Sequence, residues 1–217
     1  MPRVSITKPV IAAIERICAA IADEGCAIEA DFLPQASVAA LAEEAHARDA
    51  AGEFHAAGVG RGAAHVQRSD VRGDRILWLD QSLASSAQQP FWQGLDALRL
   101  ALNENLLLGL FSFEGHYALY PPGTYYRRHR DRFRDAAGSS NIRVISCAIY
   151  LNENWAPTDG GELRIYDGER VRDVLPVAGT LVCFLSDRFE HEVLPATRER
   201  LALTGWFRHR TKRIGAS

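Results

Sequence analysis

The stretch Tyr125-Tyr126-Arg127-Arg128-His129-Arg130-Asp131 decides the fold, because it places a histidine and an aspartate two residues apart on an apparent strand edge. Residues i and i+2 of a strand point to the same side, so His129 and Asp131 can chelate one ion. A second histidine, His191, follows a later strand-like run. Two imidazoles and one carboxylate are the ligands of a non-haem Fe(II) site with open coordination positions. These residues predict a metal centre between strands that the fold brings together.

The segment Arg200-Leu201-Ala202-Leu203-Thr204-Gly205-Trp206 is an apolar strand that contains one arginine and one threonine. Alternate residues share one face of a strand, so Arg200 and Thr204 are expected to point together into the interior. A buried guanidinium needs an anionic partner, and its planar fork suits a carboxylate bound through two hydrogen bonds. A bound carboxylate ligand is one interpretation, and an ion pair with one of the chain's own carboxylates is the other.

The hydropathy pattern changes once along the chain, from helical periodicity to short β-rich runs. Helices are predicted over residues 9–24, 34–50 and 89–108. A short strand is expected at 26–30, and the glycine-containing stretch 52–73 is expected to form a loop with short strands. Many short strands separated by turn residues then predict a sandwich or a barrel. These β-rich runs cover 111–120, 142–151, 161–167, 170–175, 180–185, 191–193 and 201–208.

The composition is that of a globular protein, with 47% hydrophobic and 24% charged residues over a length of 217 that suits one domain. A net charge of −2 gives no general attraction to nucleic acid or to an anionic membrane, so neither is expected as a partner. The four cysteines form no Cys-x-x-Cys pair and stand in apolar stretches, as free thiols do in a reducing compartment. Residues 1–9 do not resemble a signal peptide, and no stretch is long enough to span a bilayer. We therefore expect a cytoplasmic location.

Further motifs surround the predicted metal ligands in a consistent order. They are residues 120–131, 149–155, 160–165, 184–188, 191–193 and 200–206, with 68–74 further upstream. Together, residues 113–207 resemble the catalytic core of the 2-oxoglutarate- and Fe(II)-dependent oxygenases. The resemblance is to the prolyl 4-hydroxylase branch, which includes the hypoxia-inducible-factor prolyl hydroxylases and their bacterial relatives.

This resemblance implies an α+β, mainly β fold. The expected architecture is a distorted double-stranded β-helix, or jelly roll, supported by N-terminal helices. Residues 1–110 would form the helical support and the substrate loop, 111–210 the oxygenase core and 211–217 a tail. A monomer is expected.

The resemblance also implies the metal chemistry. His129, Asp131 and His191 would bind Fe(II), with 2-oxoglutarate as co-substrate, O2 as oxidant and ascorbate as a plausible reductant. Relatives that halogenate have a small residue at the position of Asp131, so the carboxylate present here argues for hydroxylation.

The co-substrate pocket follows from the same motifs. Arg200, with Tyr150 and Thr204, is implied to hold the far carboxylate of 2-oxoglutarate. Trp206 is implied to form part of the pocket wall. For Tyr150 and Trp206 the alternative is an ordinary core aromatic residue.

Two further tyrosines, Tyr120 and Tyr126, flank the turn before the metal ligands. The resemblance implies that they reach the co-substrate or the water on the iron. The interval between them is one residue shorter than in the family's hydroxylases, which puts the role of Tyr120 in more doubt than that of Tyr126.

Residues 68–74 resemble the mobile loop that covers the substrate in this branch, which favours a polypeptide substrate. The segment 58–79 has many glycines and charges and few apolar anchors, so it is predicted to be a mobile lid. Asp74 and Arg143 are predicted to form an ion pair that latches the closed lid, with Arg72 beside them. The alternative is that Asp74 and Arg143 are solvated surface residues.

A run of cationic side chains surrounds the metal motif. It predicts either a solvated rim or a mouth that attracts an acidic peptide. The run consists of Arg127, Arg128, Arg130, Arg132 and Arg134, with Arg143 beyond it.

The preferred function is hydroxylation of prolyl residues in a protein substrate, with succinate and CO2 as co-products. A hydroxylase of free proline or another small molecule is the alternative. A non-catalytic jelly-roll binding module is a third hypothesis, but a binder has no need to keep the complete His, Asp, His and Arg set.

Overall fold

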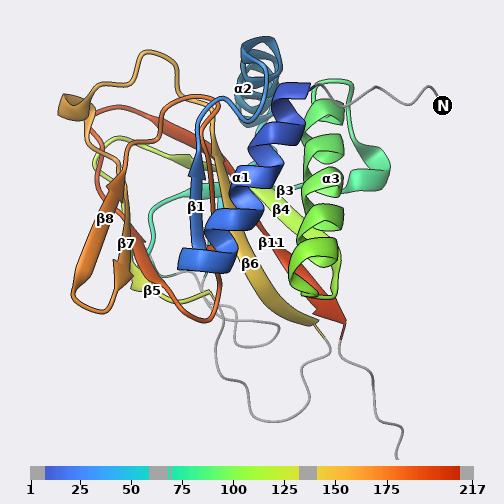
Figure 1. The fold of residues 1–217 in the computed structure, drawn as a ribbon. Coiled ribbons are helices and arrows are strands. Elements are labelled where there is room, and N and C mark those ends of the chain that lie inside the picture. The colour runs from blue at the N-terminus through green and yellow to red at the C-terminus, as the bar shows by residue number, and fades with distance from the viewer. Residues whose placement is uncertain (1–7, 59–67, 69, 132–140, 211–217) are drawn as a thin grey trace, which may run out of the picture.

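The computed structural model describes residues 8–58, 68, 70–131 and 141–210, which fold into a mainly β structure with three helices (Figure 1). The predicted tail 211–217, the middle of the predicted lid and positions 132 and 134 of the cationic run lie outside the described residues. The helices are α1 (Lys8–Glu24), α2 (Gln35–Ala50) and α3 (Gln89–Leu106). The strands are β1 (Cys26–Glu29), β2 (His55–Ala56), β3 (Arg75–Trp78), β4 (Leu110–Tyr120), β5 (Tyr126–His129), β6 (Asn141–Tyr150), β7 (Leu163–Asp167), β8 (Arg170–Val174), β9 (Leu181–Leu185), β10 (Glu190–Val193) and β11 (Arg200–Arg210).

The strands form two antiparallel sheets. One has seven strands in the order β1-β9-β6-β11-β4-β3-β2, and the other has four in the order β5-β10-β7-β8. β11 lies inside the larger sheet and pairs with β4 on one side and β6 on the other. The predicted jelly roll with N-terminal helices is confirmed.

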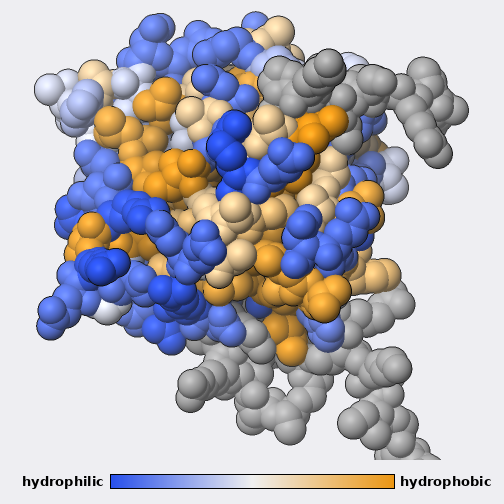
Figure 2. Space-filling view, in the orientation of Figure 1, coloured by the Kyte–Doolittle hydropathy of each residue, from blue (hydrophilic) through white to orange (hydrophobic). Residues whose placement is uncertain are grey.

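The helices cover one face of the seven-stranded sheet (Figure 1). On α1, Ile14, Ile17 and Ile21 are buried, because spacings of three and four residues put them on one side of the helix. Leu98 and Leu102 do the same on α3, which packs against α1. The outer side of this layer mixes apolar and charged side chains (Figure 2). Among the described residues, no helix combines the length and hydropathy needed to cross a membrane.

The opposite face of the seven-stranded sheet packs on the four-stranded sheet. Strand alternation separates the two sides of β11. Leu201 and Leu203 join the core under the helices, whereas Ala202 joins a second buried cluster with Ile165 and Val193 of the smaller sheet. The space between the sheets is where the predicted site residues converge.

The predicted lid over residues 58–79 is wrong at its C-terminal end. Residues Arg75–Trp78 form β3, which pairs with β4 in the register Ile76↔Ala118. Ile76 and Leu77 are buried and anchor this part of the segment in the sheet. Four residues are too few for periodicity to distinguish a strand from a loop, which explains the error. Residues 59–67 and 69 of the predicted lid lie outside the described part of the chain.

Gly205 of β11 lies opposite Gly115 of β4, where the two backbones approach closely. A Cβ at position 205 would lie 2.7 Å from the Gly115 Cα and would overlap the Glu114 carbonyl oxygen. We expect Gly205→Ala to lower the free energy of unfolding by about 3 kcal/mol, because the strands must move apart. Urea denaturation measures this change.

Gly168→Ala is the matched control, because nothing lies within 4 Å of a Cβ built there. Only its positive φ of 63° opposes the substitution, at a cost of about 1 kcal/mol. Equal losses in the two variants would contradict the importance of the close approach at Gly205.

Candidate metal and co-substrate site

The three predicted metal ligands lie together. His129 ends β5, Asp131 follows two residues later, and His191 lies in β10, where it is directly opposite His129. The Nε2 atoms of His129 and His191 each lie 3.6 Å from an oxygen of Asp131. One ligand atom from each of the three residues lies within 4.8 Å of the others. This donor set fits Fe(II).

Hydrogen bonding and burial prepare both imidazoles for a metal. Nδ1 of His129 lies 2.7 Å from the carbonyl oxygen of Arg127. A carbonyl only accepts, so Nδ1 donates its proton and Nε2 keeps a free lone pair. Burial lowers the pKa of His191 to about 4, against the opposing effect of Asp131, so this ring is neutral near pH 7. Metal binding requires neutral histidines.

Asp131 is ionised although it is buried. Burial by itself raises its pKa, but the interactions with His191 and His129 and a hydrogen bond from Ser146 outweigh burial and hold the pKa below its usual range. The Ser146 hydroxyl donates to Asp131 Oδ2 over 2.6 Å. The carboxylate is therefore available as the third, anionic ligand.

Arg200 is buried beside the metal ligands without an acidic partner. Its exposed fraction is 3%, and its Nε donates to the carbonyl oxygen of Gly161 over 2.8 Å. Its guanidinium carbon lies 5.2 Å from the ring centroid of Tyr120 and 5.1 Å from that of Tyr150. Among the described residues, no carboxylate forms an ion pair with it, so an internal ion pair does not explain this arginine.

The hydroxyl of Tyr150 is a second unsatisfied group at this end of the site. It is buried and has no hydrogen-bond partner among the described residues. Burial raises the pKa of Tyr150 to about 12, although the nearby Arg200 charge acts in the opposite direction. A neutral hydroxyl donor next to an unpaired guanidinium fits the carboxylate of a bound ligand.

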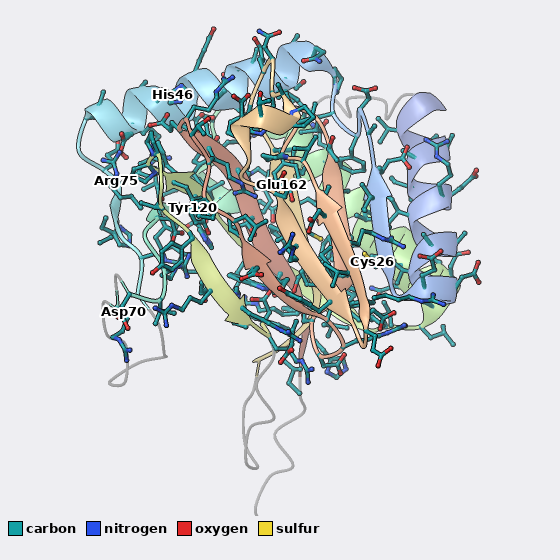
Figure 3. The ribbon with its side chains drawn as sticks, turned by 90° about the vertical axis from the view of Figure 1, so that its left-hand side faces the viewer. Cys26, His46, Asp70, Arg75, Tyr120 and Glu162 are labelled. Carbon is teal, nitrogen blue, oxygen red and sulfur yellow. The ribbon has the colours of Figure 1, made fainter. Side chains whose placement is uncertain are left out.

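Both groups of residues line one cavity of about 600 Å³. Thr204 lies in its wall and donates its hydroxyl to the Cys147 carbonyl oxygen over 3.1 Å. Tyr120 lies within the body of the molecule, whereas Asp70 of the predicted substrate loop lies at its edge (Figure 3). The predicted site residues that line the cavity are His129, Asp131, His191, Arg200, Tyr150, Thr204, Tyr126, Tyr120, Trp206, Arg72 and Arg143.

Comparison with known proteins identifies the family. A sequence model of the 2OG-Fe(II) oxygenase superfamily matches residues 115–208. The crystal structure of a Pseudomonas putida prolyl-4-hydroxylase is 47% identical, with a TM-score of 0.79, and the match covers 91% of this chain and 100% of that one. This chain belongs to the 2OG-Fe(II) oxygenase superfamily.

Two further relatives place this oxygenase beside prolyl hydroxylases. The prolyl hydroxylase of Trichoplax adhaerens, solved with a peptide fragment of the hypoxia-inducible-factor oxygen degradation domain, is 26% identical with a TM-score of 0.81 and 94% coverage of both chains. Human Egl nine homolog 1 is 30% identical over 222 residues, a match that covers 93% of this chain and 48% of that protein. The oxygenase spans about half the length of the curated relatives it matches.

The described part of the substrate loop is bound to the strand that carries His129. Backbone hydrogen bonds of 3.0 and 2.9 Å join residues 71–73 to residues 125–127. The guanidinium of Arg72 lies 4.3 Å above the ring of Tyr126. That ring stacks on His129 with centroids 3.7 Å apart. Residues 71–73 are therefore docked, in contrast to the mobile lid predicted for this region.

The predicted latch between Asp74 and Arg143 is wrong. The Asp74 side chain is 0% exposed and accepts a hydrogen bond of 2.7 Å from Nε of Arg72. Arg143 donates to Glu114 over 3.1 Å and stacks on Trp206 at 3.3 Å. The alternative of two solvated residues fails too, because Asp74 is buried. A nearby partner two residues away along the chain, Arg72, takes the place of the predicted distant one.

Carboxylates pair with several members of the cationic run in the described part of the chain. Nε of Arg128 donates to Glu190 over 2.9 Å, and Arg130 lies 4.0 Å from the same carboxylate. Arg143 is paired with Glu114. These contacts favour the paired, solvated rim over a mouth that attracts an acidic peptide.

His116 was not among the predicted site residues. It lines the cavity, is 2% exposed and packs against the rings of Trp78 and Trp206, at centroid distances of 4.7 and 5.6 Å. Neither ring nitrogen has a hydrogen-bond partner among the described residues. Burial lowers its pKa well below the usual value, so the ring is neutral. Its position, two and four residues before cavity-lining Ala118 and Tyr120 on one strand, was the available signal.

We expect Asp74→Asn to release residues 71–74 from β5. The substitution keeps the shape of the side chain but leaves the Arg72 charge buried without its partner, at a cost of about 3 kcal/mol. Hydrogen exchange measured by mass spectrometry should be faster at residues 71–74 and 125–127. The control is Asp70→Asn, because the Asp70 pair with Arg68 is exposed and contributes little. Unchanged exchange in Asp74→Asn would show that the backbone bonds alone hold the loop.

The metal-free oxygenase should lose stability as the pH falls from 7 to 5. An unfolded histidine takes up a proton near pH 6.5, whereas buried His116 does not. For each buried histidine that stays neutral in the folded state, the free energy of unfolding falls by up to about 1.4 kcal/mol per pH unit below about pH 6.5. His116→Met removes this contribution, so the variant should lose less unfolding free energy than the wild type in urea titrations at the two pH values. Equal losses would mean that folded His116 is protonated.

Proposed function

We propose that this oxygenase hydroxylates prolyl residues of a polypeptide substrate, using Fe(II), 2-oxoglutarate and O2 and releasing succinate and CO2. The main observation behind this proposal is that one cavity is lined both by the cluster of His129, Asp131 and His191 and by Arg200, which has no carboxylate partner among the described residues. A metal-binding triad alone would fit many reactions. A buried cation that lacks an internal partner adds the requirement for an anionic ligand beside the metal.

Each group of residues has a separate task in this proposal. His129, Asp131 and His191 hold the iron, and Arg200 with Tyr150 binds the far carboxylate of 2-oxoglutarate through charge-assisted hydrogen bonds. When bound, the iron and the co-substrate supply the oxidising chemistry, and the protein supplies position and shields the site from water.

The remaining predicted residues shape the cavity. Tyr120 supports Arg200 by stacking, and Thr204 lies on the same face of β11. Tyr126 stacks on His129 and restrains that imidazole. Trp206 forms an apolar part of the cavity wall, and the guanidinium of Arg143 stacks on its ring.

Charge at the cavity supports a polypeptide over free proline. A free amino acid carries a carboxylate, and its binding site needs a cation for it. Arg72 is paired with Asp74, and Arg143 is paired with Glu114. Arg200 is the cation that would bind the far carboxylate of 2-oxoglutarate. A neutral peptide segment suits the Arg72–Asp74 pair, while Arg143 shares Glu114 with Arg208. The Trichoplax relative was solved with a peptide fragment, which adds support for a polypeptide substrate.

We further propose a monomeric, cytoplasmic enzyme that uses ascorbate to keep the iron reduced and binds neither nucleic acid nor membrane. Four buried free cysteines support the cytoplasmic location, and a net charge of −2 supports the absence of nucleic-acid and membrane binding. Size-exclusion chromatography with light scattering tests the monomer.

Mass spectrometry of cell extracts, with and without the gene, tests the proposed activity. We expect prolyl peptides that gain the mass of one oxygen atom only when the gene is present. Restoring the gene with His129→Ala should not restore the modification. If the gene changes free hydroxyproline and no peptide, the small-molecule alternative replaces the proposal.

Arg200→Ala should raise the apparent KM for 2-oxoglutarate by at least 30-fold, because losing one partner of a desolvated charge pair costs roughly 2–5 kcal/mol. Arg200→Lys should recover only part of the loss, since a point charge replaces a planar fork. Succinate release at varied 2-oxoglutarate concentration measures both variants. A native KM in Arg200→Ala would place the carboxylate elsewhere.

A further inference from the structure

We propose that Ser146 and Ser186 are positioning residues of the metal centre: their hydroxyls form a directed hydrogen-bond chain that orients the Asp131 carboxylate and strengthens metal binding. The inference rests on the proposed site of His129, Asp131 and His191. It goes beyond that site, because neither serine is a ligand.

The chain is short and closed to solvent. Ser146 Oγ lies 2.6 Å from Asp131 Oδ2 and 2.9 Å from Ser186 Oγ. The exposed fractions are 8% for Asp131, 3% for Ser146 and 0% for Ser186. Asp131 and Ser146 line the cavity, but the low exposure of all three residues limits competition from bulk water.

The hydrogen bond from Ser146 Oγ to Asp131 Oδ2 fixes the direction of both bonds. A carboxylate only accepts, so the single proton of Ser146 is directed to Asp131. The Ser146 oxygen then accepts, and the proton between the two serines comes from Ser186. The order is therefore Ser186 to Ser146 to Asp131, and Ser186 acts on the carboxylate only through Ser146.

Asp131 needs this support more than the two histidines do. His129 and His191 lie in β5 and β10 and are held opposite each other by the strand pairing. Asp131 lies in a bend beyond the end of β5. The strand ladder therefore does not fix its side chain, and the serine chain does.

The two serines are held by the other sheet, Ser146 within β6 and Ser186 in the turn directly after β9. Ser146 lies on β6 opposite Phe184 of β9, and the Ser186 amide donates to the Val144 carbonyl oxygen over 2.9 Å. The two hydrogen bonds thus connect Asp131, which follows a strand of the four-stranded sheet, to β6 inside the seven-stranded sheet. Partners of this kind, outside the ligand set, change metal affinity by about 10- to 100-fold when they are removed.

The test measures Mn(II) binding by titration calorimetry and the visible absorption of the Co(II)-loaded protein. We expect Ser146→Ala to weaken Mn(II) binding about 10-fold and to shift the Co(II) bands. Ser186→Ala should weaken binding less, because Ser146 keeps its bond to Asp131. The double variant should match Ser146→Ala. Ser112→Ala is the control, since Ser112 bonds to Arg208 on the same sheet outside the cavity.

The outcomes separate this inference from the proposed function. If His129→Ala binds Mn(II) as tightly as the wild type, the metal site itself is wrong. If His129→Ala loses binding while Ser146→Ala keeps native affinity and spectrum, only the serine chain is wrong. A Ser186→Ala effect that persists undiminished in the Ser146→Ala background also overturns the chain. Should Ser146→Ala fail to fold, the Co(II) spectrum of Ser186→Ala decides, and an unshifted spectrum rejects the inference.

Discussion

The antiparallel pairing of β5 with β10 is the constraint on which the site depends. It places His129 opposite His191, and β10 is fixed in turn by its ladder with β7, where His191 faces Ile165. Backbone ladders hold Cα positions without any contribution from a ligand. The backbones of two of the three candidate metal ligands are therefore positioned by strand pairing, whereas Asp131 lies beyond the strand and is held through its hydrogen bond from Ser146.

Charge pairing divides the cavity into two ends. Arg72 and Arg143 have carboxylate partners, whereas Arg200 is buried and has none among the described residues. An unpaired buried charge is costly. The contacts of the Arg200 guanidinium with the rings of Tyr120 and Tyr150 reduce that cost, but they do not replace an anion. The Arg200 end thus suits an acidic ligand, whereas at the other end the cations already have carboxylate partners: Arg72 is paired with Asp74, and Arg143 shares Glu114 with Arg208.

Residue spacing within one strand predicted which side chains point to the same side. It did not predict which side chains of separate strands come into contact. The spacing of His129 and Asp131 and of Arg200 and Thr204 follows from strand alternation, and the structure places all four on the cavity. The prediction for Asp74 failed because it chose a distant partner, Arg143, whereas the observed partner is Arg72, only two residues away. Family resemblance identified motif residues but did not assign a role to Ser146 or Ser186, because their contact with Asp131 joins separate strands. His116 was missed although its alternation with Ala118 and Tyr120 on one strand was available.

The use of both edges of β5 connects the substrate loop with the metal centre. One edge bonds to β10 and sets the pair of histidines, and the other bonds to residues 71–73. Side chains follow the same route, since Arg72 lies on Tyr126 and Tyr126 lies on His129. β5 has only four residues, so its ladder is short, and each edge contributes a large share of its stability. The loop is therefore part of what holds His129 in place, and residues 71–73 have a structural role at the site as well as any role toward substrate.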